Sequence, residues 1–137
     1  MPPFKAIFFF ITIIPLSLFA QQPQLHIFGE PELSQSEIVA VRDDKTGQFC
    51  AAIQVITDLQ GFGYSANIGV VRVDFSKPGR DMVFLLPQER ILEIFHADFQ
   101  PLKLIFSEMG INLQPKQVWT IKLTGDKKIT DGFPHFN

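Results

Sequence analysis

Short apolar runs separated by turn-forming residues constrain the fold of this 137-residue chain more than any other feature. The clearest run is residues 69–75, GVVRVDF, in which Val71, Val73 and Phe75 alternate with their neighbours. A period of two is typical of a β-strand with two different faces. Since no helical segment is long enough to cross between parallel strands, we expect antiparallel pairing.

Seven such runs follow one another at spacings of roughly 8–15 residues, as in all-β domains. They cover residues 37–41, 50–57, 69–75, 81–86, 90–96, 102–106 and 117–123. The predicted fold class is therefore all-β, an antiparallel, Ig-like β-sandwich of about seven strands. Residues 87–99, PQERILEIFHADF, also suit a helical period, and we favour a strand because the flanking segments are strands.

The first twenty residues have the outline of a secretory signal peptide. Lys5 precedes a largely apolar stretch, and the small residue Ala20 offers a cleavage site. The stretch from Ala6 to Ala20 is shorter than the roughly 20 residues of a membrane-spanning helix, so cleavage is favoured over a retained anchor. We therefore expect a secreted or periplasmic protein that acts at the cell envelope.

The remaining chain is the right length for one domain. We expect a flexible lead-in at residues 21–35, a β-sandwich domain at residues 36–124 and a polar tail at residues 125–137. Lys and Arg number 12 and Asp and Glu 14, so the chain lacks the basic excess of a nucleic-acid-binding protein.

Cys50 is the single cysteine, which excludes an intramolecular disulfide in a chain expected to be exported. Its setting in CAAIQVI predicts a small buried side chain. The three histidines are far apart in sequence and show no metal-ligand spacing, so no metal and no cofactor are expected.

Glu93, His96 and Asp98 form the one compact cluster of acid and imidazole groups in the sequence. General acid–base catalysis needs such groups to converge in a cleft. On a strand, however, His96 and Asp98 would share one face and Glu93 the other, so a surface turn is the simpler interpretation. A small secreted hydrolase or carbohydrate-active enzyme remains the alternative, and the favoured prediction is a protein that is not an enzyme.

Residues 58–67, DLQGFGYSAN, are expected to form an exposed loop because Gly61 and Gly63 flank Phe62 within it. Phe62 and Tyr64 could present their rings to solvent, as sugar-binding and protein-binding surfaces do. Phe62 could instead cover the open end of the sandwich. The expected partners are a protein or a glycan at the envelope, with no nucleic acid and no permanent membrane span after cleavage.

The segment HADFQPLKLIF, followed by LQPKQVWTIKL, resembles the second half of the small β-sandwich modules called PEGA-like or carboxypeptidase-regulatory-like domains. DKTGQFCAAIQVIT is similar to their opening. In this resemblance, Asp98 and Phe99 take the Gly and Tyr positions of a Gly-Tyr-x-Pro corner that Pro101 completes. The resemblance implies a non-enzymatic module with a binding or structural role, and it adds Asp98 and Phe99 to Phe62 and Tyr64 as candidate binding residues.

Overall fold

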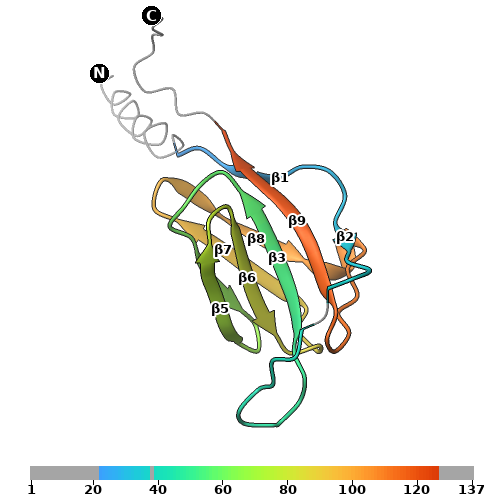
Figure 1. The fold of residues 1–137 in the computed structure, drawn as a ribbon. Coiled ribbons are helices and arrows are strands. Elements are labelled where there is room, and N and C mark those ends of the chain that lie inside the picture. The colour runs from blue at the N-terminus through green and yellow to red at the C-terminus, as the bar shows by residue number, and fades with distance from the viewer. Residues whose placement is uncertain (1–21, 38, 127–137) are drawn as a thin grey trace, which may run out of the picture.

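The computed structural model describes residues 22–37 and 39–126, which form two β-sheets packed face to face (Figure 1). The all-β class and the sandwich arrangement predicted from the sequence are confirmed, with nine strands among the described residues. The predicted signal peptide at residues 1–20 and most of the predicted tail, residues 127–137, lie outside the described residues.

The larger sheet is built on a path of five strands, and a further strand, β2 (Glu32–Leu33), pairs with one of them. In spatial order the path is β1 (Leu25–Ile27), β9 (Val118–Gly125), β3 (Ala51–Thr57), β6 (Arg80–Leu85) and β5 (Val70–Lys77). The smaller sheet is formed by β4 (Gly63–Ala66), β7 (Ile91–His96) and β8 (Phe99–Ile105), and a short 3-10 helix, Phe106–Met109, follows it. Among residues 22–37 and 39–126, no helix has the length and apolar character that a membrane span requires.

β3 and β9 pair in parallel, whereas the other paired strands are antiparallel. This pair departs from the expected antiparallel arrangement. Parallel neighbours need a long connection, and here the chain forms β4 to β8 between them. A crossover helix is unnecessary because these strands themselves carry the chain across the sandwich.

Six of the seven predicted strands are confirmed within a few residues, including the strand at 90–96 that competed with a helix. The strand predicted at residues 37–41 is wrong for the part that the structure describes. Val39 donates its N–H to the carbonyl of Lys116, and Val39 and Val41 pack on the outer face of the larger sheet. Burial of these valines, rather than strand pairing, explains the apolar run.

β8 begins at Phe99, three residues before the strand predicted at residues 102–106. A two-residue turn, Ala97–Asp98, joins β7 to β8, and Pro101 lies within β8. Proline is accepted on the edge strand of a sheet because its missing N–H can face away from the ladder.

The segment predicted as a lead-in, residues 21–35, contains β1 and β2. Both strands pair with β9 in the larger sheet.

The core lies between the sheets, where side chains of β3 point inward in alternation. Ala51, Ile53 and Val55, at alternating positions of β3, are fully buried there. β5 does not alternate in the same regular way, because a bulge follows Val70. As a result, Val71 packs on the outer face of the sheet instead of sharing the face of Val73.

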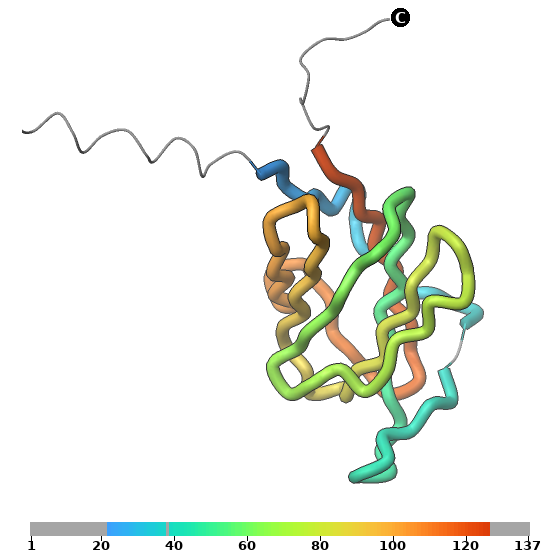
Figure 2. Tube along the Cα trace, turned by 90° about the vertical axis from the view of Figure 1, so that its left-hand side faces the viewer, coloured from blue at the N-terminus to red at the C-terminus, as the bar shows by residue number. Residues whose placement is uncertain are grey.

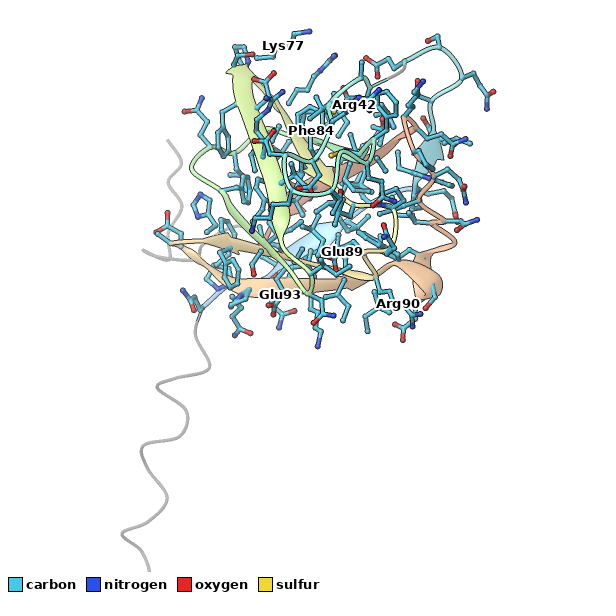
Figure 3. The ribbon with its side chains drawn as sticks, turned by 90° about the horizontal axis from the view of Figure 1, so that it is seen from below. Arg42, Lys77, Phe84, Glu89, Arg90 and Glu93 are labelled. Atoms are coloured by element: carbon cyan, nitrogen blue, oxygen red, sulfur yellow. The ribbon has the colours of Figure 1, made fainter. Side chains whose placement is uncertain are left out.

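The carboxylate of Glu89 holds the segment that crosses from the smaller sheet to the larger one. Glu89 is 4% exposed, and its two oxygens accept five backbone N–H groups. The donors are Asn67, Ile68, Gly69, Arg90 and Ile91, at 2.7–3.4 Å. Seen from below, Glu89 lies between the two layers, whereas Glu93 belongs to the smaller sheet (Figure 3).

The first and last described residues lie side by side at one end of the molecule (Figure 2). Asp126 donates its backbone N–H to the carbonyl of Gln24 at 3.0 Å. Its carboxylate also lies 2.7 Å from Nε2 of His26, in an exposed pair. Gly125, the first residue of the predicted tail, is the last residue of β9, so the sheet extends one residue into that segment.

Candidate functional site

Aromatic rings from both sheets follow one another across one end of the sandwich. We call this set the aromatic row, and it runs Phe75, Tyr64, Phe62, His96 and Phe99. Successive ring centroids are 6.4, 6.3, 5.0 and 5.1 Å apart. Tilted and edge-on pairs at such distances are favourable arrangements of aromatic rings.

Two turns bring the row together at this end of the molecule. The β5–β6 turn places Phe75 and Asp81 near each other, and Gly79 in that turn has φ of 76°, which favours glycine. The β7–β8 turn places His96 beside Phe99. The row therefore reaches from the free edge of the larger sheet to the first residue of β8.

Tyr64 and Asp81 join the two sheets within this end. The hydroxyl of Tyr64 on β4 donates to Oδ2 of Asp81 on β6 at 2.6 Å. Burial, followed by the bond to the negatively charged Asp81, raises the pKa of the Tyr64 phenol well above its ordinary value. The bond fixes the orientation of the Tyr64 ring, against which Phe75 lies at an interplanar angle of 30°.

A hollow of about 450 Å³ opens beside Phe75 and Asp81. Its other lining residues are Leu59, Gln60, Gly61, Ser76, Lys77, Pro78 and Gly79. The hollow thus combines an exposed ring with a carboxylate, a hydroxyl, an amide and an ammonium group. Ligand sites typically combine apolar surface with a few polar groups that fix orientation.

The structure divides the two predicted loop aromatics between core and surface. Phe62 is 5% exposed and belongs to the main core, so the expectation that it presents its ring to solvent is wrong. The alternative, that it covers the end of the sandwich, agrees with this burial. Tyr64 is partly buried and begins the exposed part of the row.

Phe75 is the exposed ring of the aromatic row, with 56% of its surface accessible, and it is not among the residues predicted to bind. The sequence contained a usable signal, because Phe75 ends an alternating strand just before Lys77-Pro78-Gly79. An aromatic residue at that position lies at the rim of a sheet rather than deep in its core. Asp81, on the other side of the same turn, is likewise a strand residue that was not among the predicted binding residues.

His96 and Asp98 meet through the backbone rather than through an acid–imidazole pair. The N–H of Asp98 donates to Nδ1 of His96 at 3.0 Å, so Nε2 carries the proton and donates to the carbonyl of Gln60 at 2.7 Å. Both ring nitrogens are thereby occupied in holding the β7–β8 turn against the loop before β4. Glu93 lies in mid-strand, opposite Lys103 of β8.

The structure connects Phe99 to the row and leaves Asp98 beside it. Phe99 is half-buried, contacts His96 edge-on and packs against the backbone of Gly125. Asp98 is exposed in the turn. Of the four predicted binding residues, Phe62, Tyr64 and Phe99 are therefore placed in one row, with Asp98 next to it.

A second hollow, of about 490 Å³, lies on the side of the sandwich where the buried carboxylate of Glu89 is found. Its rim includes Arg90, Ile91, Ile105, Phe106 and Leu113. Because the two oxygens of Glu89 already accept five N–H groups, we assign this carboxylate a structural role. The aromatic row and its hollow, which carry an exposed ring, form the stronger candidate.

Cys50 is fully buried, as its sequence context predicted. Desolvation, with a further contribution from Asp43, raises the pKa of its thiol. Within the described part of the chain, His, Cys, Asp and Glu side chains do not gather in groups of three that could hold a metal ion. Searches against models of protein families, curated proteins and solved structures found no match to this chain.

Proposed function

We propose that this protein is an exported, non-enzymatic β-sandwich module that binds a partner at the cell envelope through the end of the aromatic row formed by the partly buried Tyr64 and the exposed Phe75. The observation that carries this proposal is the 56% exposure of Phe75 beside a polar-lined hollow. A large apolar ring that is exposed at a concave surface is typical of a site that a partner covers on binding.

A glycan is the partner that this chemistry fits best. The C–H face of a sugar ring can rest on Phe75, while its hydroxyl groups need donors and acceptors close by. Ser76, Lys77 and Asp81 supply both kinds of group along the same hollow. The hydrogen bond from Tyr64 leaves Oδ1 of Asp81 available as an acceptor.

Export is supported by the composition of residues 1–20 and by the use of cysteine. A basic residue, an apolar stretch and a small residue follow one another there. The lone Cys50 is buried, so it is protected from forming mixed disulfides in an oxidising compartment. A PEGA-like module, implied by the sequence resemblance, would have the same location and the same kind of binding role.

Titration with soluble fragments of envelope polysaccharides, followed by amide NMR shifts, tests the proposal. We expect shifts concentrated at Phe75, Ser76 and Lys77, and at least a tenfold weaker affinity in Phe75→Ala, since one aromatic anchor commonly contributes about 2 kcal/mol or more. Phe95→Ala is the matched control because Phe95 is also exposed, at 37%, but lies outside the row.

Two results would contradict the proposal. Equal affinity of the wild type and Phe75→Ala would remove the row from the binding site. Saturable binding of envelope proteins at the same amides, with none of the glycan fragments, would retain the surface and replace the glycan by a protein partner.

A further inference from the structure

β5 ends the path of strands in the larger sheet, and its outer edge carries no hydrogen-bonded neighbour among the described strands (Figure 1). β6 covers its other edge along most of its length. Residues 74–77 of β5 are all exposed. A free edge presents backbone N–H and C=O groups that can pair with another strand.

Two irregularities limit the part of this edge that can pair. Register shifts occur between Val70 and Arg72 and again between Asp74 and Lys77. The stretch from Arg72 to Asp74 lies between them and pairs regularly with Phe84, Val83 and Met82. Bulges of this kind protect sheet edges against extended pairing, so any added strand has a short, defined register.

The regular stretch carries opposite charges on one face. Arg72 and Asp74 both lie on the outer side of the sheet, opposite Phe84 and Met82. Phe84 and Met82 pack there in an outer apolar cluster with Val39, Cys50, Ala52 and Val118. Both side chains are exposed, and the Arg72 guanidinium lies 5.3 Å from the centroid of the Phe84 ring. Hydrogen bonds from Ser76 lower the pKa of the Asp74 carboxyl.

From this arrangement we propose that β5 pairs in antiparallel orientation with β5 of a second copy of the chain, about a two-fold axis at Val73. Arg72 then lies opposite the partner's Asp74, and Asp74 opposite the partner's Arg72. Val73 faces the partner's Val73. The larger sheets of the two copies become one continuous sheet, and the contact is isologous, as in most homodimers.

The charges select this register over its neighbours. Centring the pair on Arg72 would place two guanidinium groups opposite each other, and centring it on Asp74 would do the same with two carboxylates. Like charges directly opposite on paired strands are destabilising, whereas opposite charges stabilise the pair. Charged edge residues also disfavour pairing with unrelated strands, so self-pairing is the arrangement that the Arg72–Asp74 pattern favours.

Neither Arg72 nor Asp74 lines the hollow of the proposed glycan site, to which β5 contributes Phe75, Ser76 and Lys77. A pairing of a few residues is smaller than a standard interface of about 1,600 Å², so we expect a weak dimer. Its dissociation constant should lie between about 10 μM and about 1 mM. Glycan titrations at protein concentrations well below this dissociation constant measure binding to the monomer. The glycan proposal and the dimer proposal can therefore fail separately.

Sedimentation equilibrium on the exported form, from about 1 μM to about 1 mM, provides the test. The wild type should dimerise, and Arg72→Asp and Asp74→Arg should each lower the association constant about tenfold or more because like charges then face each other. Lys103→Asp, a charge reversal at an exposed position of β8, should leave the association constant unchanged. Circular dichroism confirms that each variant is folded.

Mixing the two single variants is the decisive experiment. The carboxylate introduced by Arg72→Asp then faces the guanidinium introduced by Asp74→Arg, and the unchanged Asp74 of the first variant faces the unchanged Arg72 of the second. The mixture should therefore associate more strongly than either variant does alone. The double variant R72D/D74R should likewise recover dimerisation. A wild type that stays monomeric at about 1 mM, or folded variants that fail to associate when mixed, would overturn the proposal.

Discussion

The hydroxyl of Tyr64 donates a 2.6 Å hydrogen bond to the carboxylate of Asp81, and this contact joins the smaller sheet to the larger one. A bond to a charged acceptor contributes about 1.5–3 kcal/mol, less where solvent reaches the pair. Tyr64→Phe should therefore lower the free energy of unfolding by about 1–2 kcal/mol. Urea denaturation of Tyr64→Phe, Asp81→Asn and the double variant gives the coupling energy. Additive effects of the two substitutions would show that the bond contributes no stability.

The same bond predicts a pH dependence above neutrality. Because the folded protein raises the pKa of Tyr64, its contribution to stability is complete below about pH 10, the ordinary pKa of tyrosine, and is lost as the pH rises toward the folded value. Tyr64 is the single tyrosine of the chain, so phenolate absorbance measures this residue alone. Absorbance should rise together with unfolding, and Tyr64→Phe should lose this part of the pH dependence. Ionisation near pH 10 in the folded protein would contradict the assignment.

Glu89→Gln should destabilise the fold strongly. The substituted amide keeps one acceptor oxygen and turns an NH₂ group toward backbone donors that Glu89 now satisfies. We expect a loss of about 3 kcal/mol or more, because several buried backbone N–H groups lose their charged acceptor at once. Amide exchange at Asn67, Ile68 and Gly69 should accelerate before global unfolding. Glu108→Gln, at an exposed carboxylate, is the control, and equal stability of the two variants would show that the five contacts are not needed.

Substitution by alanine should lower the free energy of unfolding much more at Phe62 than at Phe75. Phe62 is 5% exposed, so Phe62→Ala should lower the free energy of unfolding by about 3–5 kcal/mol through the cavity it leaves. Phe75→Ala should change it by less than about 1 kcal/mol because that ring is already largely in water. Thermal and urea denaturation provide the comparison. A large loss of stability in Phe75→Ala would mean that this ring is structural and would weaken the proposed site.

Cys50 should resist thiol reagents in the folded protein. Its side chain is fully buried, and its pKa is raised, so both access and thiolate fraction are low. Labelling should follow the opening of the fold and accelerate with urea in proportion to the unfolded fraction. Rapid labelling without denaturant would show that the segment around residues 39–41, which packs over Cys50, opens readily.

The alternation of apolar residues in the sequence correctly predicted the strands that line the core between the two sheets. The run 50–57 alternates as a period of two predicts, with Ala51, Ile53 and Val55 in the core between the sheets and Cys50 and Ala52 in the outer cluster. Residues 37–41 have the same apolar character but form no strand where they are described, because Val39 and Val41 pack on the outer face of the larger sheet and make single backbone hydrogen bonds instead of a ladder. Apolar pattern alone does not distinguish these two ways of burying a valine.

The candidate site was predictable in part. Tyr64 and Phe99 were selected from their turn and corner settings, and the structure places both in the aromatic row. Phe75 and Asp81 were missed because each belongs to a strand, and their role depends on a neighbour from the other sheet. Packing across the sandwich also decides that Phe62 lies in the core and Phe75 at the surface.

The sequence by itself determined the all-β class, the order of most strands, the burial of Cys50 and the expectation of export, because these follow from local periodicity, turn chemistry and composition. The tertiary structure alone decided the parallel pairing of β3 with β9, the hydrogen bonds from residues 67–69 to the Glu89 carboxylate and the contact of Tyr64 with Asp81. Each of these joins segments that are distant in sequence or belong to different sheets. Such contacts depend on how the sheets pack, and no local pattern of residues encodes them.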